Sequence, residues 1–323
     1  MSDQNQAAVR PPQGTPSPQL QESGLITPGE HAGGEYERLT DAAPEQGIYH
    51  IVGGYLDDAG EVHSEVHLRA MSGVEEDLMG NRSVPMMDRL NSILKSCTHR
   101  IGSIVDQGQI VQAIDRLPTG SRAHMLLCLR ITSHWKRHKS IFSMQARCPY
   151  RGCEQRSSYD VDLLTVETYD MPHPMVREHV VADLDCGQSV KWRVAATPQE
   201  KVLQLVSGLD EISALTYAIL TRLVAVDDED VRLSASDFLT PDHKKLKLSP
   251  KAKEMFAWAK KLSVGDRDAL RDSFLDEEPG IEDEIDFTCN HCHREFTRVL
   301  DIMQETFWFP SLTSRRLKTR SST

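Results

Sequence analysis

Two short cysteine pairs constrain this chain more than any other feature. Cys148 and Cys153 flank a turn in RCPYRGCEQ, and Cys289 and Cys292 flank another in CNHC. Alternating apolar and polar residues surround each pair, as in SIFSMQARC and SSYDVDLL, which predicts a β-hairpin with the cysteines in its turn. Two facing turns of this kind supply four thiolates, the ligand set that zinc favours in closed tetrahedral sites.

We therefore predict one structural Zn²⁺ ion held by four thiolates, those of Cys148, Cys153, Cys289 and Cys292. Their separation in sequence is no obstacle, because the entropy of closing a loop grows only with the logarithm of its length. Pro149 and Gly152 favour a tight turn, and we expect Gly152 to relieve crowding beside the second cysteine. His291 and His293 stay open as alternative ligands for one position, since imidazole also binds zinc.

The other three cysteines show no metal-binding pattern. Cys97 and Cys128 fall on apolar faces of predicted helices, where cysteine behaves as a small hydrophobic residue. Cys186, in DLDCGQS, is interpreted as a loop thiol. Neither a secretory signal nor an apolar run of about 18 residues occurs, so we expect an unsecreted protein without a membrane span. Its cysteines are then more typical of free thiols and metal ligands than of disulfides.

The charge of the chain argues against nucleic acid as a partner. There are 37 basic and 48 acidic residues, a formal net charge of −11, which repels phosphate backbones unless basic residues form a patch. Short basic stretches occur at 134–139 and 315–320, and the first is interpreted as a solvated helix end. Nucleotide-binding and hydrolase motifs are missing, and the acidic residues occur in runs typical of solvated surfaces. We expect no enzymatic activity.

Hydrophobic periodicity predicts an α+β fold: a four-cysteine, zinc-ribbon-like β unit with an N-terminal β-hairpin and a large, mainly helical insertion. The predicted segments are a disordered acidic Pro/Gly-rich arm (1–46), a β-hairpin (47–72), a helical segment (73–138), the first ribbon hairpin (139–165), a mainly helical insertion (166–280), the second ribbon hairpin with an aromatic end (281–310) and a basic flexible tail (311–323).

Several helix boundaries are predicted from capping residues. Ser72 and Glu75 form a possible capping box, and Ser249 followed by Pro250 predicts another helix start. TPQEKVLQLVSG predicts a helix from 197 that closes on Gly208. The apolar stretch 210–230, DEISALTYAILTRLVAVDDED, predicts one helix with an acidic end.

A series of stretches in fixed order resembles a known family. They are VHLRAMSGVEEDLM, IDRLPTGSRAHMLLCLRITS, the strand into RCPYRGC, TPQEKVLQLVSG, WAKKLSVGDRDALRDSF and the ending PGIE…C-x₂-C…FWFP. Together they cover about residues 60–310 and resemble the T4-like baseplate hub and tail-assembly proteins of contractile-tailed phages, with relatives in phage-like contractile injection systems. The first cysteine pair departs from that pattern, because Tyr150 and Arg151 expand C-x₂-C to C-x₄-C.

The resemblance implies a non-enzymatic protein of tail morphogenesis, either a baseplate component or an assembly factor. Its partners would be other baseplate or hub proteins. The resemblance implies that the protein acts in the host cytoplasm during assembly, and the virion tail baseplate is the other location that it implies. Phe307, Trp308 and Phe309 are either interface anchors or, as we favour, packed onto the protein's own ribbon. The alternative functions are a zinc-ribbon nucleic-acid-binding module and a metal-dependent hydrolase, which would need an open zinc position.

Overall fold

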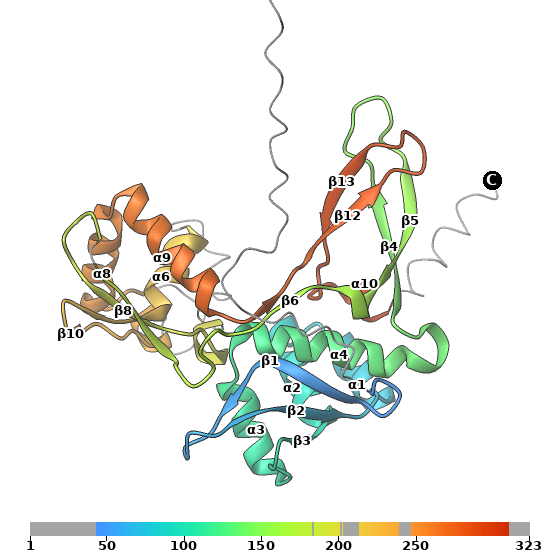
Figure 1. The fold of residues 1–323 in the computed structure, drawn as a ribbon, viewed down its shortest axis with the longest axis horizontal. Coiled ribbons are helices and arrows are strands. Elements are labelled where there is room, and N and C mark those ends of the chain that lie inside the picture. Colours follow the sequence, from blue (N-terminus) through green and yellow to red (C-terminus); the bar gives the residue numbers. More distant parts are fainter. Residues whose placement is uncertain (1–42, 183, 201, 203–212, 239–246, 310–323) are drawn as a thin grey trace, which may run out of the picture. The chain divides into compact units, whose positions relative to one another are not determined.

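The computed structural model describes residues 43–182, 184–200, 202, 213–238 and 247–309. The arm and the tail predicted at the two ends of the chain lie almost wholly outside these residues. The described part is a mixed α+β fold with several small sheets, as the sequence indicated (Figure 1). No described helix is both long and apolar enough to cross a lipid bilayer.

The β-hairpin predicted near the N-terminus is present and gains a third strand. Strands β1 (Ile48–Leu56) and β2 (Val62–Leu68) pair antiparallel, and β3 (Thr98–Ile101) pairs with β2 on its other side. Tyr49 and Ile51 are buried on β1, so one face of this sheet belongs to a hydrophobic core. A two-stranded hairpin is marginally stable in water, and the third strand and the buried face overcome that limit.

Four helices follow or interrupt these strands: α1 (Gly73–Gly80), α2 (Met86–Cys97), α3 (Gln107–Arg116) and α4 (Thr119–His138). Ser72 and Glu75 form the predicted capping box of α1. Every side chain from Met125 to Ile131 on α4 is buried. A helix stretch that is buried on all sides lies inside a core, and α4 therefore lies within the core that also contains the buried residues of β1.

Both hairpins expected around the cysteine pairs are present. Strands β4 (Ile141–Arg147) and β5 (Arg156–Asp162) pair antiparallel, as do β12 (Glu284–Thr288) and β13 (Glu295–Val299). The two hairpins lie side by side in Figure 1, although each is a separate two-stranded sheet. A short helix, α10 (Glu305–Trp308), follows β13.

The segment between the two hairpins has its own core and more β-structure than the predicted mainly helical insertion. The elements in chain order are the 3₁₀ helix η2 (Leu163–Thr165), β6 (Thr168–Tyr169), β7 (Glu178–Val181), β8 (Val190–Arg193), α6 (Ala214–Arg222), β9 (Leu223–Val226), β10 (Glu229–Asp230), α7 (Ala235–Phe238), α8 (Pro250–Lys261), α9 (Val264–Glu277) and β11 (Gly280–Ile281). Strands β10, β9, β8 and β7 form a four-stranded sheet in that order, and β11 pairs with β6. The core of this segment includes Trp192, Tyr217, Phe238 and Phe256.

The single helix predicted over 210–230 is wrong in its second half. Helix α6 ends at Arg222, and Leu223 begins β9, which pairs with β8 and β10. All four side chains of β9 are buried, so the apolar run belongs to a central strand and not to a helix face. The helix predicted from 197 is described at 197–200 and 202, and its end at Gly208 lies outside the described residues.

Candidate metal centre

The turns of the two hairpins bring four cysteine sulfurs together. The Sγ atoms of Cys148 and Cys292 are 3.7 Å apart, and those of Cys153 and Cys289 are also 3.7 Å apart. All four sulfurs lie within 4.8 Å of one another. In a regular tetrahedron with Zn–S bonds of about 2.3 Å, neighbouring sulfurs lie about 3.8 Å apart. The four thiols therefore have the spacing of a tetrahedral metal site.

The first turn is shaped by its backbone. The N–H of Cys148 donates to the carbonyl of Gln155 at 2.9 Å, and the N–H of Cys153 donates to the carbonyl of Tyr150 at 3.2 Å. Gly152 has φ +86°, a conformation that favours glycine. Apart from its two chain neighbours, no residue comes within 4 Å of where its Cβ would be, so its backbone angle is the observed reason for glycine.

The second turn presents backbone N–H groups to sulfur. The N–H of His291 points at Cys289 Sγ at 3.5 Å. Hydrogen bonds from the N–H groups of Cys292 and His291 lower the pKa of the Cys289 thiol to about 6, whereas burial raises that of Cys148. Cys289 is thus more ready than Cys148 to bind a metal as a thiolate, and loading the Cys148 thiol would release a proton.

Aromatic side chains fill the space between the two hairpins. The ring centroid of Tyr159 on β5 lies 4.9 Å from that of Phe287 and 5.9 Å from that of Phe296, on β12 and β13. The rings of Phe287 and Phe296 lie 5.9 Å apart. Because no strand of one hairpin pairs with a strand of the other among the described sheets, these rings and the sulfurs carry much of the contact between them.

The remaining candidate ligands lie outside the sulfur cluster. His291 and His293 are exposed, and the clustered group contains cysteines alone. Cys97 and Cys128 are fully buried, as expected of small hydrophobic residues, in the core that also contains the buried residues of β1 and α4, which we call the first core. Cys186 is exposed.

The basic stretch 134–139 is a solvated helix end, and Phe307 and Trp308 pack onto the protein itself, the interpretations that the sequence favoured. Lys136 and Arg137 are exposed in the last turn of α4, and the Lys139 ammonium lies 4.8 Å from the ring centroid of Trp135. Phe307 and Trp308 are 1% and 0% exposed and pack into the first core, so they are not surface anchors. The second basic stretch, 315–320, lies outside the described residues.

A second group of metal-ligating side chains was missed in the sequence. Asp57, Glu61 and His63 each place one ligand atom within 4.8 Å of the others at the turn between β1 and β2. The one feature of the sequence that could have indicated this group is the closeness of the three residues around the predicted DDAG turn. Acidic residues are so common in turns that this spacing alone does not indicate a metal.

Comparison with known proteins places the chain in a family. The family model described as "T4 bacteriophage base plate protein" matches residues 58–308, which include both cysteine pairs and the buried aromatic end. No curated protein and no solved structure matches the chain. The match covers well over half of the sequence, and the chain therefore belongs to the T4 bacteriophage base plate protein family.

Proposed function

We propose that this protein is a non-enzymatic structural or assembly protein of a contractile phage tail, acting at the baseplate or hub, and that a structural Zn²⁺ ion at its four cysteines holds its two hairpins together. Family membership supports the baseplate role. The convergence of four sulfurs from sequence-distant turns carries the metal part of the proposal. Its partners are other baseplate or hub proteins.

Zinc has a clear physical task in this fold. A two-stranded hairpin is marginally stable by itself in water, and β4–β5 and β12–β13 each form a separate two-stranded sheet that needs contacts with other elements. The residues between them form a second core, so the chain alone does not hold the hairpins in register with each other. A metal ion bound by both turns supplies that link, and its binding free energy becomes folding free energy.

The ligand set also supports a structural role for the ion. A catalytic zinc keeps one position open for water or substrate, whereas four cysteine ligands close the coordination shell. Cys148 and Cys289 are almost completely buried, which further restricts access of a substrate to the ion. A closed coordination shell of this kind argues against a hydrolytic role for the four-cysteine centre.

Metal analysis of the purified protein tests the centre. We expect one zinc per chain, lost in Cys153→Ser and Cys292→Ser variants. Cys186→Ser is the matched control, because Cys186 is an exposed thiol outside the cluster and its loss should leave the zinc content unchanged. Zinc that persists in both ligand variants, or purified native protein that is folded and metal-free, would overturn the structural zinc.

Affinity purification from a host that expresses the complete tail gene set tests the baseplate role. We expect recovery with baseplate or hub proteins, at a level that falls when Cys292→Ser removes the metal. A titration with DNA at several salt concentrations tests the nucleic-acid alternative, since phosphate binding weakens steeply as salt rises. Salt-dependent DNA binding without recovery of any tail protein would replace the baseplate proposal with that alternative.

A further inference from the structure

Figure 1 shows the turn that joins β1 and β2. Side chains at this turn gather two carboxylates around a buried imidazole. Asp57 follows β1, Glu61 immediately precedes β2, and His63 is the second residue of β2. His63 Nε2 lies 3.2 Å from Asp57 Oδ2, and His63 Nδ1 lies 4.0 Å from Glu61 Oε1. These groups come from the N-terminal hairpin and have no residue in common with the four-cysteine centre.

The imidazole is held in a fixed orientation. His63 is 4% exposed, and its ring stacks on that of Tyr55 with a centroid distance of 6.1 Å and an angle of 21° between the planes. On its other side lies Gly102, where an added Cβ would come within 2.4 Å of His63 Nδ1. Gly102 thus leaves room for the ring. An imidazole positioned in this way loses little rotational freedom when it binds an ion.

The Asp57 carboxylate is oriented just as firmly. Its Oδ1 accepts hydrogen bonds from the N–H groups of Ala59 at 2.9 Å and Glu61 at 2.8 Å, which leaves Oδ2 directed at His63.

The oxygen–nitrogen distance suits a shared metal ion. With metal–ligand bonds of about 2.1 Å, adjacent ligand atoms lie about 3.0 Å apart in an octahedron and about 3.4 Å apart in a tetrahedron. The observed 3.2 Å between Oδ2 and Nε2 falls between these values. An ion can therefore replace the shared proton without displacing either group, while the exposed Glu61 side chain rotates to supply another oxygen.

No lysine or arginine pairs with the carboxylates of Asp57 and Glu61 among the described ion pairs. Arg116, the last residue of α3, pairs through Nη2 with Asp58 of the turn at 2.9 Å and not with Asp57 or Glu61. The two carboxylates therefore have no lysine or arginine as a fixed counter-charge among the described ion pairs, and a divalent ion would supply one.

We propose that Asp57, Glu61 and His63 form a second metal site, which takes a divalent first-row transition metal ion such as Mn²⁺. Mixed imidazole and carboxylate ligands suit such ions. Three protein ligands leave coordination positions for water or for a side chain of a neighbouring protein. The site is thus an exchangeable metal position at the tip of a hairpin, unlike the closed sulfur site, and it does not depend on the role proposed for the zinc centre.

Titration of the zinc-loaded full-length protein with Mn²⁺ tests the proposal, because Mn²⁺ prefers oxygen and nitrogen ligands and leaves thiolate sites alone. Free Mn²⁺ is measured by electron paramagnetic resonance, and broadening of assigned histidine ring signals locates the ion. We expect one saturable Mn²⁺ site per chain and selective broadening of the His63 ring over that of His67, which lies on the same strand. Asp57→Asn and Glu61→Gln should each weaken binding at least about tenfold.

Asp58→Asn is the matched control. It removes the same charge from the same turn, but Asp58 pairs with Arg116 and is not part of the cluster. Its Mn²⁺ affinity should stay within about twofold of the unsubstituted protein. Absence of saturable binding, or an Asp58→Asn loss as large as that of Asp57→Asn, would show that the acidic turn attracts cations without a site and would overturn the proposal.

Discussion

The hydroxyl of Tyr150, in the turn of the first hairpin, donates a hydrogen bond to the carbonyl oxygen of Glu295 on the second hairpin at 2.6 Å. The guanidinium of Arg294 lies 5.1 Å from the centroid of the same ring. Tyr150 is one of the residues that widen the first cysteine pair to C-x₄-C. The additional turn length therefore places an aromatic side chain across the gap between the hairpins, directly beside the sulfur cluster.

Removing this bridge should loosen the metal centre without abolishing it. A single neutral hydrogen bond contributes about 0.5–1.5 kcal/mol, so Tyr150→Phe should speed the transfer of zinc to a chelator by about twofold to tenfold. Tyr150→Ala also loses the contact with Arg294 and should be faster still. Chelator competition followed by absorbance measures both rates. Equal rates for the native protein and both variants would show that Tyr150 contributes nothing to the link.

The sequence predicted the clustering of the four cysteines because its information is local. Each cysteine pair lies within one hairpin turn, and alternation on both sides identifies the strands without knowledge of the rest of the fold. The partner of each sulfur could not be predicted in this way. That Cys148 lies against Cys292 and Cys153 against Cys289 depends on how the hairpins face each other, which aromatic packing around Tyr159 determines.

The four-stranded sheet was less predictable because its strands are buried and short. LVAV at 223–226 continues the apolar pattern of α6, and only pairing with β8 and β10 shows that it is a strand. The Asp57 cluster was missed for a different reason. His63 becomes a candidate ligand only once its burial against Tyr55 and Gly102 is known, and those contacts join different segments of the chain.

Chelation of the zinc should release the hairpins before the rest of the protein. The segment around Trp192 and Tyr217 has its own core, and no sulfur of the metal centre belongs to it. We expect backbone amides of β4, β5, β12 and β13 to lose protection at least about tenfold in hydrogen exchange, while those of β8 and β9 keep theirs. An equal loss of protection in the hairpin strands and in β8 and β9 would contradict the prediction that the ion stabilises the hairpins specifically.

Trp308 should matter for the stability of the isolated protein. It is completely buried, and its Nε1–H donates to the carbonyl of Ile302 at 3.0 Å. Trp308→Ala should lower the free energy of unfolding by about 3–5 kcal/mol in urea denaturation, because it leaves a large cavity. Leu275→Ala is the control, since Leu275 is 78% exposed and should change stability by less than about 0.5 kcal/mol. Unchanged stability in Trp308→Ala would instead assign Trp308 to an interface.

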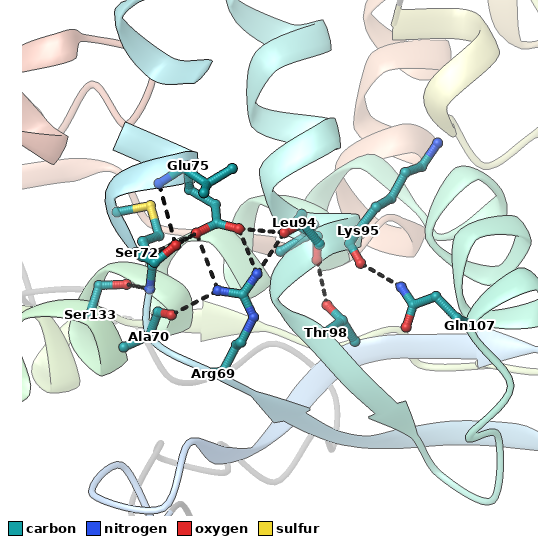
Figure 2. A network of polar contacts seen from close by, with 12 residues as sticks. Arg69, Ala70, Ser72, Glu75, Leu94, Lys95, Thr98, Gln107 and Ser133 are labelled. Carbon is teal, nitrogen blue, oxygen red and sulfur yellow. Dashed lines mark hydrogen bonds and ion pairs between the residues drawn. The ribbon is translucent and has the colours of Figure 1, made fainter. Parts of the chain in front are cut away.

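The carboxylate of Glu75 should make stability depend on pH in the acid range. Figure 2 shows it at the centre of a polar network, where Arg69 Nη2 and Ser96 Oγ each donate to Oε1 at 2.5 Å and Ser72 Oγ donates to Oε2 at 2.6 Å. The hydrogen bonds from Arg69 are the largest of the effects that hold the pKa of this buried carboxyl well below its usual value of 4.5.

Because the folded pKa of Glu75 lies below the unfolded one, its stabilising effect is complete above about pH 4.5 and declines as pH falls toward the folded pKa. Glu75→Gln should therefore cost about 1.5–3 kcal/mol at pH 7, the usual contribution of hydrogen bonds to a charged group, and less at progressively lower pH. Urea denaturation across that range measures the difference. Glu76→Gln, which changes an exposed neighbour in the same helix, should show no such trend. A Glu75→Gln cost that stays constant down to strongly acid pH would mean that shape, and not charge, accounts for the role of Glu75, because only the charged form gains from the Arg69 guanidinium.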